Sequence, residues 1–246
     1  MKLYKYRDFS LPTEDDFDRL ARVLTQQAFW AARPDTLNDP EEFSWACDYT
    51  PTDRTPSLLT DVLVTYRGQT LDQATFLANE AIRNERVAPL AGPVVRKLVD
   101  ACRDQVGLIC FGDSGSNPCL WERYAGGGTG ICIEVDVADA LMNSQIHRVQ
   151  YPVEKTVHID TFLEASTPRG AVTPLFTAAL LSKPRHWSPE AELRFVSKRQ
   201  NVAVQLAGSR ITSLVIGDKL PKDTRSRIER IAGEVPHPVP LRARKD

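Results

Sequence analysis

The sequence has almost no net charge and no block of residues of one sign. Its 31 Lys and Arg residues are matched by 32 Asp and Glu residues, which leaves a formal net charge of −1. Because the basic residues are scattered along the chain, the charge pattern does not predict nucleic-acid binding in general, and it leaves room only for a local basic groove. Hydrophobic residues make up 42% and charged residues 26%, which argues against a disordered or fibrous chain.

Long apolar runs are absent as well. No stretch reaches the roughly 18 apolar residues of a membrane span, and the segment MKLYKYR at 1–7 carries charge where a signal peptide needs an apolar run. We therefore expect a protein without a membrane partner that stays in the cytoplasm. A length of 246 residues fits one domain, 1–246, with a single hydrophobic core and a helical insert.

Several motifs of metal and nucleophile chemistry are missing. The five cysteines include no C-x-x-C pair, and the four histidines are far apart, so we expect no metal and interpret the cysteines as small buried hydrophobes. The glycine run at 126–128 leads into a strand pattern, whereas a phosphate-binding P-loop needs Gly-Lys-Ser/Thr at the start of a helix. The segment GDSGS at 112–116 lacks the G-x-S-x-G elbow of a serine hydrolase.

The pattern of hydrophobic residues predicts an α+β fold with a mixed, mainly antiparallel sheet. β-branched residues bounded by Gly or Asp predict strands, and apolar residues at helical spacing predict helices. A final edge strand is expected at 235–241, because its three prolines cannot donate to a strand ladder. The other expected strands lie at 2–7, 29–32, 107–111, 130–136 and 211–216, and the expected helices lie after Thr13, at 57–66, 70–86 and 93–105 within an insert of about 57–106, and at 222–232.

The segment WSPEAELRFV at 187–196 is the most informative part of the sequence. As a strand beginning at Glu190, it places Glu190, Glu192 and Arg194 on one face, where two nearby carboxylates can take different chemical roles. As a helix start, Ser188 would be the N-cap and the glutamates would only complement the helix dipole. The residues alone leave both interpretations open.

A second cluster is LWERYA at 120–125, which the glycine run joins to the strand pattern GICIEVD. Trp121 and Tyr124 are three residues apart and share one face of a short helix. The glycine run predicts a turn whose backbone can approach a ligand closely. Aromatic residues at this spacing belong either to a core or to a ligand platform. We expect both, with Trp187, to line the same pocket as the glutamates.

Four segments of the sequence form an ordered set that spans nearly the whole chain. They are LYKYR at 3–7, LNDPEE at 37–42, LWERYA at 120–125 with GICIEVD at 130–136, and the stretch from Lys183 to Arg194. Taken together they resemble a bacterial and phage-borne family called domain of unknown function 2971. The family's E-x-E-x-R segment matches Glu190, Glu192 and Arg194, and Arg123 stands where the family usually has a histidine.

A looser resemblance is to ADP-ribosyltransferases, which carry a His or Arg on the first strand and a Glu, often within E-x-E, on a late strand. This likeness implies an enzyme that uses NAD+ as a substrate, in a bacterial defence or toxin function. It assigns Glu192 to the ribose 2′-hydroxyl and Glu190 to the acceptor nucleophile. In the same interpretation, Trp121 or Tyr124 would hold the nicotinamide ring, and Arg7 or Arg194 would pair with the pyrophosphate.

Two other functions remain open from the sequence. One is a binding module without catalysis, which would use the same pocket for a nucleotide or a protein. The other is a nucleic-acid-processing enzyme in which Glu190, Glu192 and Glu134 hold Mg²⁺.

Overall fold

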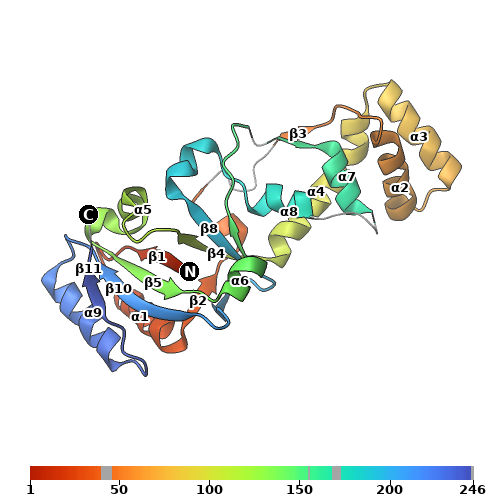
Figure 1. The fold of residues 1–246 in the computed structure, drawn as a ribbon. Helices are drawn as coiled ribbons and strands as arrows, with labels where there is room; N and C mark the ends of the chain where they lie inside the picture. The colour runs from red at the N-terminus through yellow and green to blue at the C-terminus, as the bar shows by residue number, and fades with distance from the viewer. Residues whose placement is uncertain (40–45, 155, 168–172, 245–246) are drawn as a thin grey trace. The chain divides into compact units, whose positions relative to one another are not determined.

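The computed structural model describes residues 1–39, 46–154, 156–167 and 173–244, and the chain forms two compact units (Figure 1). Unit 1 comprises 1–33, 107–149 and 186–246, and unit 2 comprises 34–106 and 150–185. The expected helical insert therefore belongs to unit 2 together with 150–185, a stretch for which the sequence predicted no element. The α+β class predicted from the sequence is confirmed. Among the described residues, none of the helices combines the length and apolarity that a membrane crossing requires.

Unit 1 is built on a seven-stranded sheet in the order β11-β10-β5-β1-β4-β8-β6. Its pairs are antiparallel except for β10 with β11, so the predicted sheet type is confirmed. A smaller antiparallel pair, β2 with β9, belongs to the same unit. The strands are β1 (Lys2–Arg7), β2 (Ala28–Ala31), β4 (Gly107–Gly112), β5 (Ile131–Asp136), β6 (Ile146–Arg148), β8 (Glu192–Ser197), β9 (Val202–Gln205), β10 (Arg210–Ile216) and β11 (Leu241–Ala243).

The large sheet consists of two well-paired halves that meet at one point. β1 is in register with β5 along its whole length, and β4 is in register with β8 along its whole length. Between β1 and β4, however, the register contains only Tyr4 opposite Gly112. Beyond this pair the Lys5 ammonium group donates to the carbonyl of Cys110 at 2.9 Å and adds a further link between the two strands.

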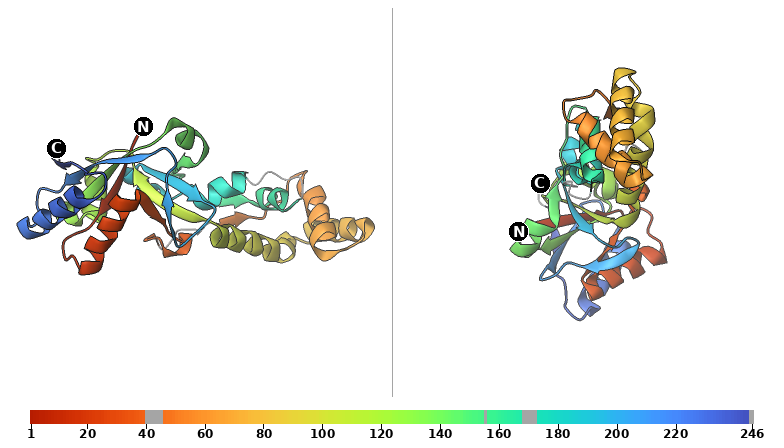
Figure 2. Two further views of the ribbon diagram at one scale, coloured as in Figure 1. Left: turned by 90° about the horizontal axis from the view of Figure 1, so that it is seen from below. Right: turned by 90° about the vertical axis from the view of Figure 1, so that its right-hand side faces the viewer.

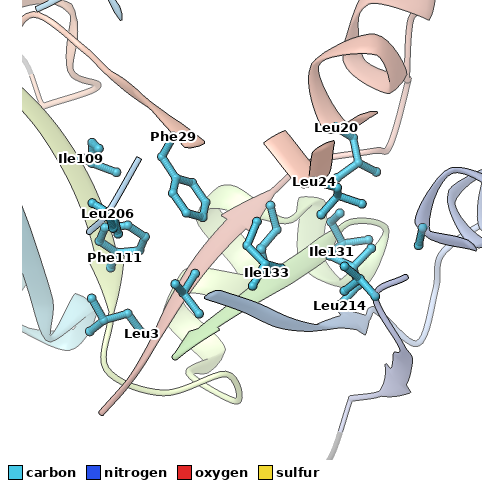
Figure 3. Close-up of a cluster of buried hydrophobic side chains, with 14 of the residues drawn as sticks. Leu3, Leu20, Leu24, Phe29, Ile109, Phe111, Ile131, Ile133, Leu206 and Leu214 are labelled. Carbon is cyan, nitrogen blue, oxygen red and sulfur yellow. The ribbon is translucent and has the colours of Figure 1, made fainter. Parts of the chain in front are cut away.

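One face of the sheet carries the main hydrophobic core. The core lies between the sheet, α1 (Glu14–Gln26), α9 (Lys222–Glu234) and the β2–β9 pair, and Figure 3 shows part of it. Leu3 of β1 and Leu193 of β8 both point into this core. The predicted start of α1 is confirmed, because the Asp16 carboxylate accepts from the backbone N–H and the hydroxyl of Thr13.

The opposite face of the sheet is covered by the short helix α5 (Pro118–Tyr124), as Figure 2 (left) shows. Here Tyr6, Leu120, Trp121 and Cys132 form a small separate cluster. Because side chains alternate along a strand, the residues of β1 with even numbers face α5 and those with odd numbers face α1. This alternation decides which predicted site residues can meet.

The remaining elements of unit 1 are short. They are the helix α6 (Asp139–Ser144) and the 3-10 turns η2 (Gly126–Gly128) and η3 (Arg185–Glu190), of which η3 begins at the boundary with unit 2.

Unit 2 has its own hydrophobic core, formed mainly by helices. A short parallel pair, β3 with β7, belongs to the same unit. The elements are η1 (Pro34–Thr36), β3 (Ala46–Asp48), α2 (Thr55–Arg67), α3 (Leu71–Arg83), α4 (Val87–Gln105), β7 (Thr156–His158), α7 (Ile159–Ser166) and α8 (Thr173–Leu180).

Two predicted boundaries are wrong. The break expected at Gly92-Pro93 does not occur, and Pro93 lies inside α4. Val87, Ala91 and Val95 are buried at a spacing of four residues, so packing of this stripe favours a continuous helix despite the lost hydrogen bond. The expected edge strand at 235–241 is also shifted, because β11 begins only after Pro240. It is an edge strand, as predicted, and it pairs with β10.

Candidate active site

Glu190 lies at the end of a turn and not on a strand. The prediction that the strand begins at Glu190 is wrong, because η3 ends there and β8 starts at Glu192. Ala191 between them has a φ of +46°, a left-handed conformation that breaks the extended backbone. The Asn117 side-chain amide donates to the carbonyl of Pro189 at 2.9 Å and so holds the turn in place. The side chains of Glu190 and Glu192 therefore project from the backbone before and after a kink at Ala191.

The Glu190 carboxylate is nevertheless directed at the helix that the sequence predicted. Its side chain accepts a hydrogen bond from the Tyr124 hydroxyl at 2.8 Å and one from the Arg123 guanidinium at 3.2 Å. The same guanidinium lies 4.4 Å from the centre of the Trp187 ring. Glu190 is only 1% exposed, whereas Arg123 is exposed and Tyr124 and Trp187 are half-buried. A buried carboxylate thus sits beneath an accessible rim of one cation and two aromatic rings.

Glu192 and Arg194 form a buried ion pair on β8. The Nε of Arg194 donates to Oε1 of Glu192 at 2.7 Å, and its Nη2 lies 3.4 Å from Oε2. Both side chains project from the face opposite Leu193, as predicted from the alternation of the strand. Glu192 is 4% exposed and Arg194 is 0% exposed. An arginine this deeply buried orients the carboxylate beside it and offers little surface to a ligand.

Helix α5 lies over the same row of residues as Glu192. Gly112 is the register partner of Glu192, and a Cβ atom at Gly112 would lie 2.4 Å from a methyl group of Leu120. Glycine is therefore required for α5 to approach the sheet here. Cys110 lies next to this row on β4. Burial is the main cause that raises the pKa of its thiol, and the negative charge of Glu192 is the second, so the pKa rises to about 12. A raised pKa favours the neutral thiol of Cys110, which is a weaker nucleophile than the thiolate.

Trp121 belongs to the packing of this face. It is 1% exposed, meets the Tyr6 ring edge-on with 5.4 Å between ring centres, and donates from its indole nitrogen to the carbonyl of Gly115 at 2.9 Å. The aromatic residues of α5 therefore divide into two groups. Trp121 fixes the helix on the sheet, and Tyr124 points to the carboxylate of Glu190.

Arg7 does not join the other predicted site residues. Its odd-numbered position on β1 directs it to the α1 side of the sheet, where it lines a pocket with Arg19 and Trp30. The inclusion of Arg7 in the site with Tyr124 is therefore wrong. The physical reason is the two-residue period of the strand, which sends Tyr4 and Tyr6 to the α5 side and Arg7 away from it.

The three glutamates considered as Mg²⁺ ligands do not converge. Glu134 lies in the same cross-strand row as Glu192. The strands β1 and β4 lie between β5 and β8, however, so the two glutamates are about 14 Å apart. Glu134 is already engaged, since Lys2 donates to it at 2.8 Å and Thr212 donates to it at 2.8 Å. Burial by itself would raise the pKa of Glu134, but the hydrogen bonds and charges of these partners hold it below its ordinary value. Across the part of the chain with described coordinates, groups of three or more metal-ligating side chains are not found.

The glycine run after α5 serves backbone packing. Gly126, Gly127 and Gly128 all have positive φ values of 55°, 61° and 106°. The carbonyl of Gly128 accepts from the backbone N–H of Lys219 at 3.0 Å. A Cβ atom at Gly128 would lie 2.5 Å from the Asp218 carboxylate. The predicted close backbone approach therefore takes place within the protein itself.

Two residues of the site were not singled out by the sequence analysis. Arg123 was noted only as a departure from a family pattern, and Asn117 was not noted at all. Asn117 had a recognisable signal, because Asn followed by Pro118 is a typical helix start, and its carboxamide oxygen accepts from the backbone N–H of Cys119 at 3.0 Å. Its second role, holding the turn before Glu190, depends on a contact across 72 positions of sequence.

Replacing Tyr124 with Phe is expected to lower the free energy of unfolding by about 1–3 kcal/mol, because a buried carboxylate loses a hydrogen-bond donor. Urea denaturation at neutral pH measures this difference. Tyr66→Phe is the matched control, since Tyr66 is 48% exposed and its substitution is expected to change the stability by less than about 0.5 kcal/mol. Equal stabilities of the two variants would show that the contact between Tyr124 and Glu190 contributes nothing.

Comparisons of the chain with models of protein families, with curated proteins and with solved structures found no match. Of the four segments on which the family resemblance depends, residues 40–42 lie outside the described residues. The resemblance therefore remains a prediction from the sequence.

Proposed function

We propose that this protein is an enzyme of the ADP-ribosyltransferase type, which cleaves the bond between nicotinamide and ribose in NAD+ and transfers ADP-ribose to an acceptor. The observation that supports this proposal is the arrangement of Glu190 and Glu192. Both carboxylates are buried, one before and one after the kink in the backbone. Arg123 pairs with Glu190, and Arg194 pairs with Glu192. Distinct environments are what two carboxylates need in order to perform different tasks.

Glu192 is assigned to the transition state of bond cleavage. As the bond between C1′ and the nicotinamide nitrogen breaks, the electron pair leaves with nicotinamide and positive charge develops on the ribose ring. A carboxylate that accepts a hydrogen bond from the 2′-hydroxyl binds this charged state more strongly than the ground state. Arg194 holds the Glu192 carboxylate in a fixed orientation through the bond of 2.7 Å.

Glu190 is assigned to the acceptor. An acceptor hydroxyl that attacks C1′ must lose its proton, and Glu190 takes this proton as general base. The products are then nicotinamide, the ADP-ribosylated acceptor and one proton. Tyr124 and Arg123 both donate to Glu190 and so hold it directly beneath the rim of the site, where an acceptor would arrive.

The accessible rim provides the contacts for the rest of NAD+. The half-buried rings of Tyr124 and Trp187 offer an aromatic face to the positively charged nicotinamide ring. Arg123 replaces Arg7 as the residue that pairs with the pyrophosphate, because it is exposed and lies over the Trp187 ring.

Incubation of the whole chain with NAD+ tests the proposal. Chromatography is expected to detect free nicotinamide in an amount that increases with time and with protein concentration. Because the acceptor is unidentified, water takes its place in this assay, and the slow release of ADP-ribose is the expected second product. Thermal stabilisation by NAD+ without nicotinamide release would contradict the proposal.

A binding module without catalysis is the second candidate, and the burial of the site favours it. Glu192 and Arg194 are almost completely inaccessible and satisfy each other, as expected of a polar network that fixes a fold. In that case ADP-ribose, which lacks nicotinamide, would stabilise the protein as much as NAD+ does. The comparison of these two ligands by thermal denaturation separates binding from turnover.

A further inference from the structure

A pocket lies on the opposite face of unit 1, away from Glu192. Its volume is about 650 Å³, which is within the range of small-molecule sites. It is formed by one face of α1, the end of β1 and the outward side of the β2–β9 pair. The residues that line it are Arg7, Asp15, Arg19, Arg22, Val23, Gln26, Ala28, Trp30 and Ala203.

The pocket has an excess of positive charge. It contains three guanidinium groups, those of Arg7, Arg19 and Arg22, and one carboxylate, that of Asp15. Asp15 pairs with Arg19 and lies 3.5 Å from Arg22, so its charge is shared by the two arginines of α1. The chain as a whole has a net charge of only −1, so this concentration of arginines is local.

Arg7 is the cation that the pocket leaves unneutralised. Within the described residues it forms neither a hydrogen bond nor an ion pair, and the nearby Asp16 carboxylate is occupied by Thr13. The Arg7 side chain as a whole is exposed, but desolvation by the protein atoms around it and, after that, the like charge of Arg19 lower its pKa. An anion placed between Arg7 and Arg19 would relieve this repulsion.

Trp30 supplies an aromatic surface beside the cations. It is 53% exposed, although its neighbours on β2 are buried, and its cross-strand partner is the small residue Ala203. A large exposed ring opposite a small residue leaves room for a flat group on the strand surface. Single exposed aromatic residues are ordinary, but one that lines a pocket with three arginines is a surface for stacking.

We propose that this pocket binds a nucleotide, with the phosphates on Arg7 and Arg19 and the base stacked on Trp30. Bidentate contacts of arginine match phosphate geometry, and an indole ring accepts any base. The pocket volume suits a mononucleotide, and the absence of a basic stripe along the sequence argues against a nucleic-acid strand. This site does not depend on the proposed cleavage of NAD+, because it lies on the other side of the sheet.

Isothermal titration of the whole chain with ADP, adenosine, inorganic phosphate and an oligothymidylate tests the proposal. ADP is expected to bind, and adenosine and phosphate are each expected to bind at least about tenfold more weakly, because each provides only half of the contacts. The affinity for ADP is expected to fall as the NaCl concentration is raised, since the guanidinium groups are exposed. ADP is also expected to quench tryptophan fluorescence.

Matched variants assign the binding to this pocket. Arg7→Gln and Trp30→Leu are each expected to weaken ADP binding about tenfold, as the loss of a charged contact or of stacking predicts. Arg230→Gln is the control, because Arg230 is an exposed arginine of α9 outside the pocket, and its variant is expected to bind ADP normally. Circular dichroism of all three variants checks that they are folded.

Any one of several results overturns the proposal. These are no binding of ADP at millimolar concentration, equal binding of adenosine and ADP, equal binding of phosphate and ADP, and unchanged ADP binding in Arg7→Gln. Tighter binding of the oligothymidylate than of ADP would also reject a nucleotide pocket in favour of a strand-binding surface. Nicotinamide release is measured separately in Arg7→Gln and is expected to be unchanged, so failure at this pocket and failure at Glu192 can be distinguished.

Discussion

Replacing Glu192 with Gln is expected to slow nicotinamide release from NAD+ at least about a hundredfold, the usual effect of removing an electrostatic group that acts in the transition state. Gln keeps the shape of the side chain but cannot oppose the positive charge on the ribose with a full negative charge. The rate is measured by chromatography at saturating NAD+. A variant that retains the rate of the wild-type protein would exclude Glu192 from the reaction.

The same substitution is expected to reduce stability, because Arg194 is completely buried and would face a neutral amide. Breaking a buried ion pair costs about 3–5 kcal/mol, and the amide oxygen still accepts from Arg194, so we expect about 3 kcal/mol. The rate must therefore be compared at a temperature where circular dichroism shows both proteins folded. Glu234→Gln is the matched control, because Glu234 is exposed at the end of α9, and its variant is expected to keep both rate and stability.

Replacing Gly130 with Ala is expected to lower the free energy of unfolding by about 3 kcal/mol, the upper range for overpacking. A Cβ atom at Gly130 would lie 2.1 Å from the carbonyl oxygen of Arg7 and 2.9 Å from the Cα atom of Ala125. Neither atom can move easily, because Arg7 is paired with Ile131 in the sheet and Ala125 is the C-cap of α5. Chemical denaturation monitored by circular dichroism measures the loss.

Gly233→Ala is the control, and it is expected to change the free energy of unfolding in the opposite direction. Gly233 lies inside α9, and a Cβ atom there would have no neighbour within 4 Å. Alanine favours the helix over glycine, so this variant is expected to gain up to about 1 kcal/mol. If both variants changed stability in the same direction, the close approach at Gly130 would not be the cause.

The two interpretations of residues 187–196 show what local sequence can and cannot predict about this segment. The alternation from Glu192 onward correctly predicted a strand with Glu192 and Arg194 on one face. The boundary at Glu190 was wrong because it depends on the amide of Asn117, which lies far away in the sequence. The helix interpretation was wrong as well, since Ser188 and Pro189 are part of a 3-10 turn.

Arg7 illustrates a second feature that local sequence does not predict, namely which helix covers each face of a strand. The strand at 2–7 was predicted correctly, and the alternation of its side chains was known from the sequence. Which face would meet α5 depends on the packing of α1 and α5 against the sheet, and this packing is not encoded in the strand itself. The pocket around Trp30 was missed for the same reason, because its residues come from four elements that only the fold brings together.

The sequence by itself determined the α+β class, most strands and helices of unit 1 and the helical nature of 57–106, because these follow from periodicity, glycine and proline within short segments. Only the tertiary structure decided that Tyr124 meets Glu190 and that Arg7 faces Arg19. Contacts of this kind depend on the pairing of strands distant in sequence and on which helix covers each face. A local pattern contains no information about either.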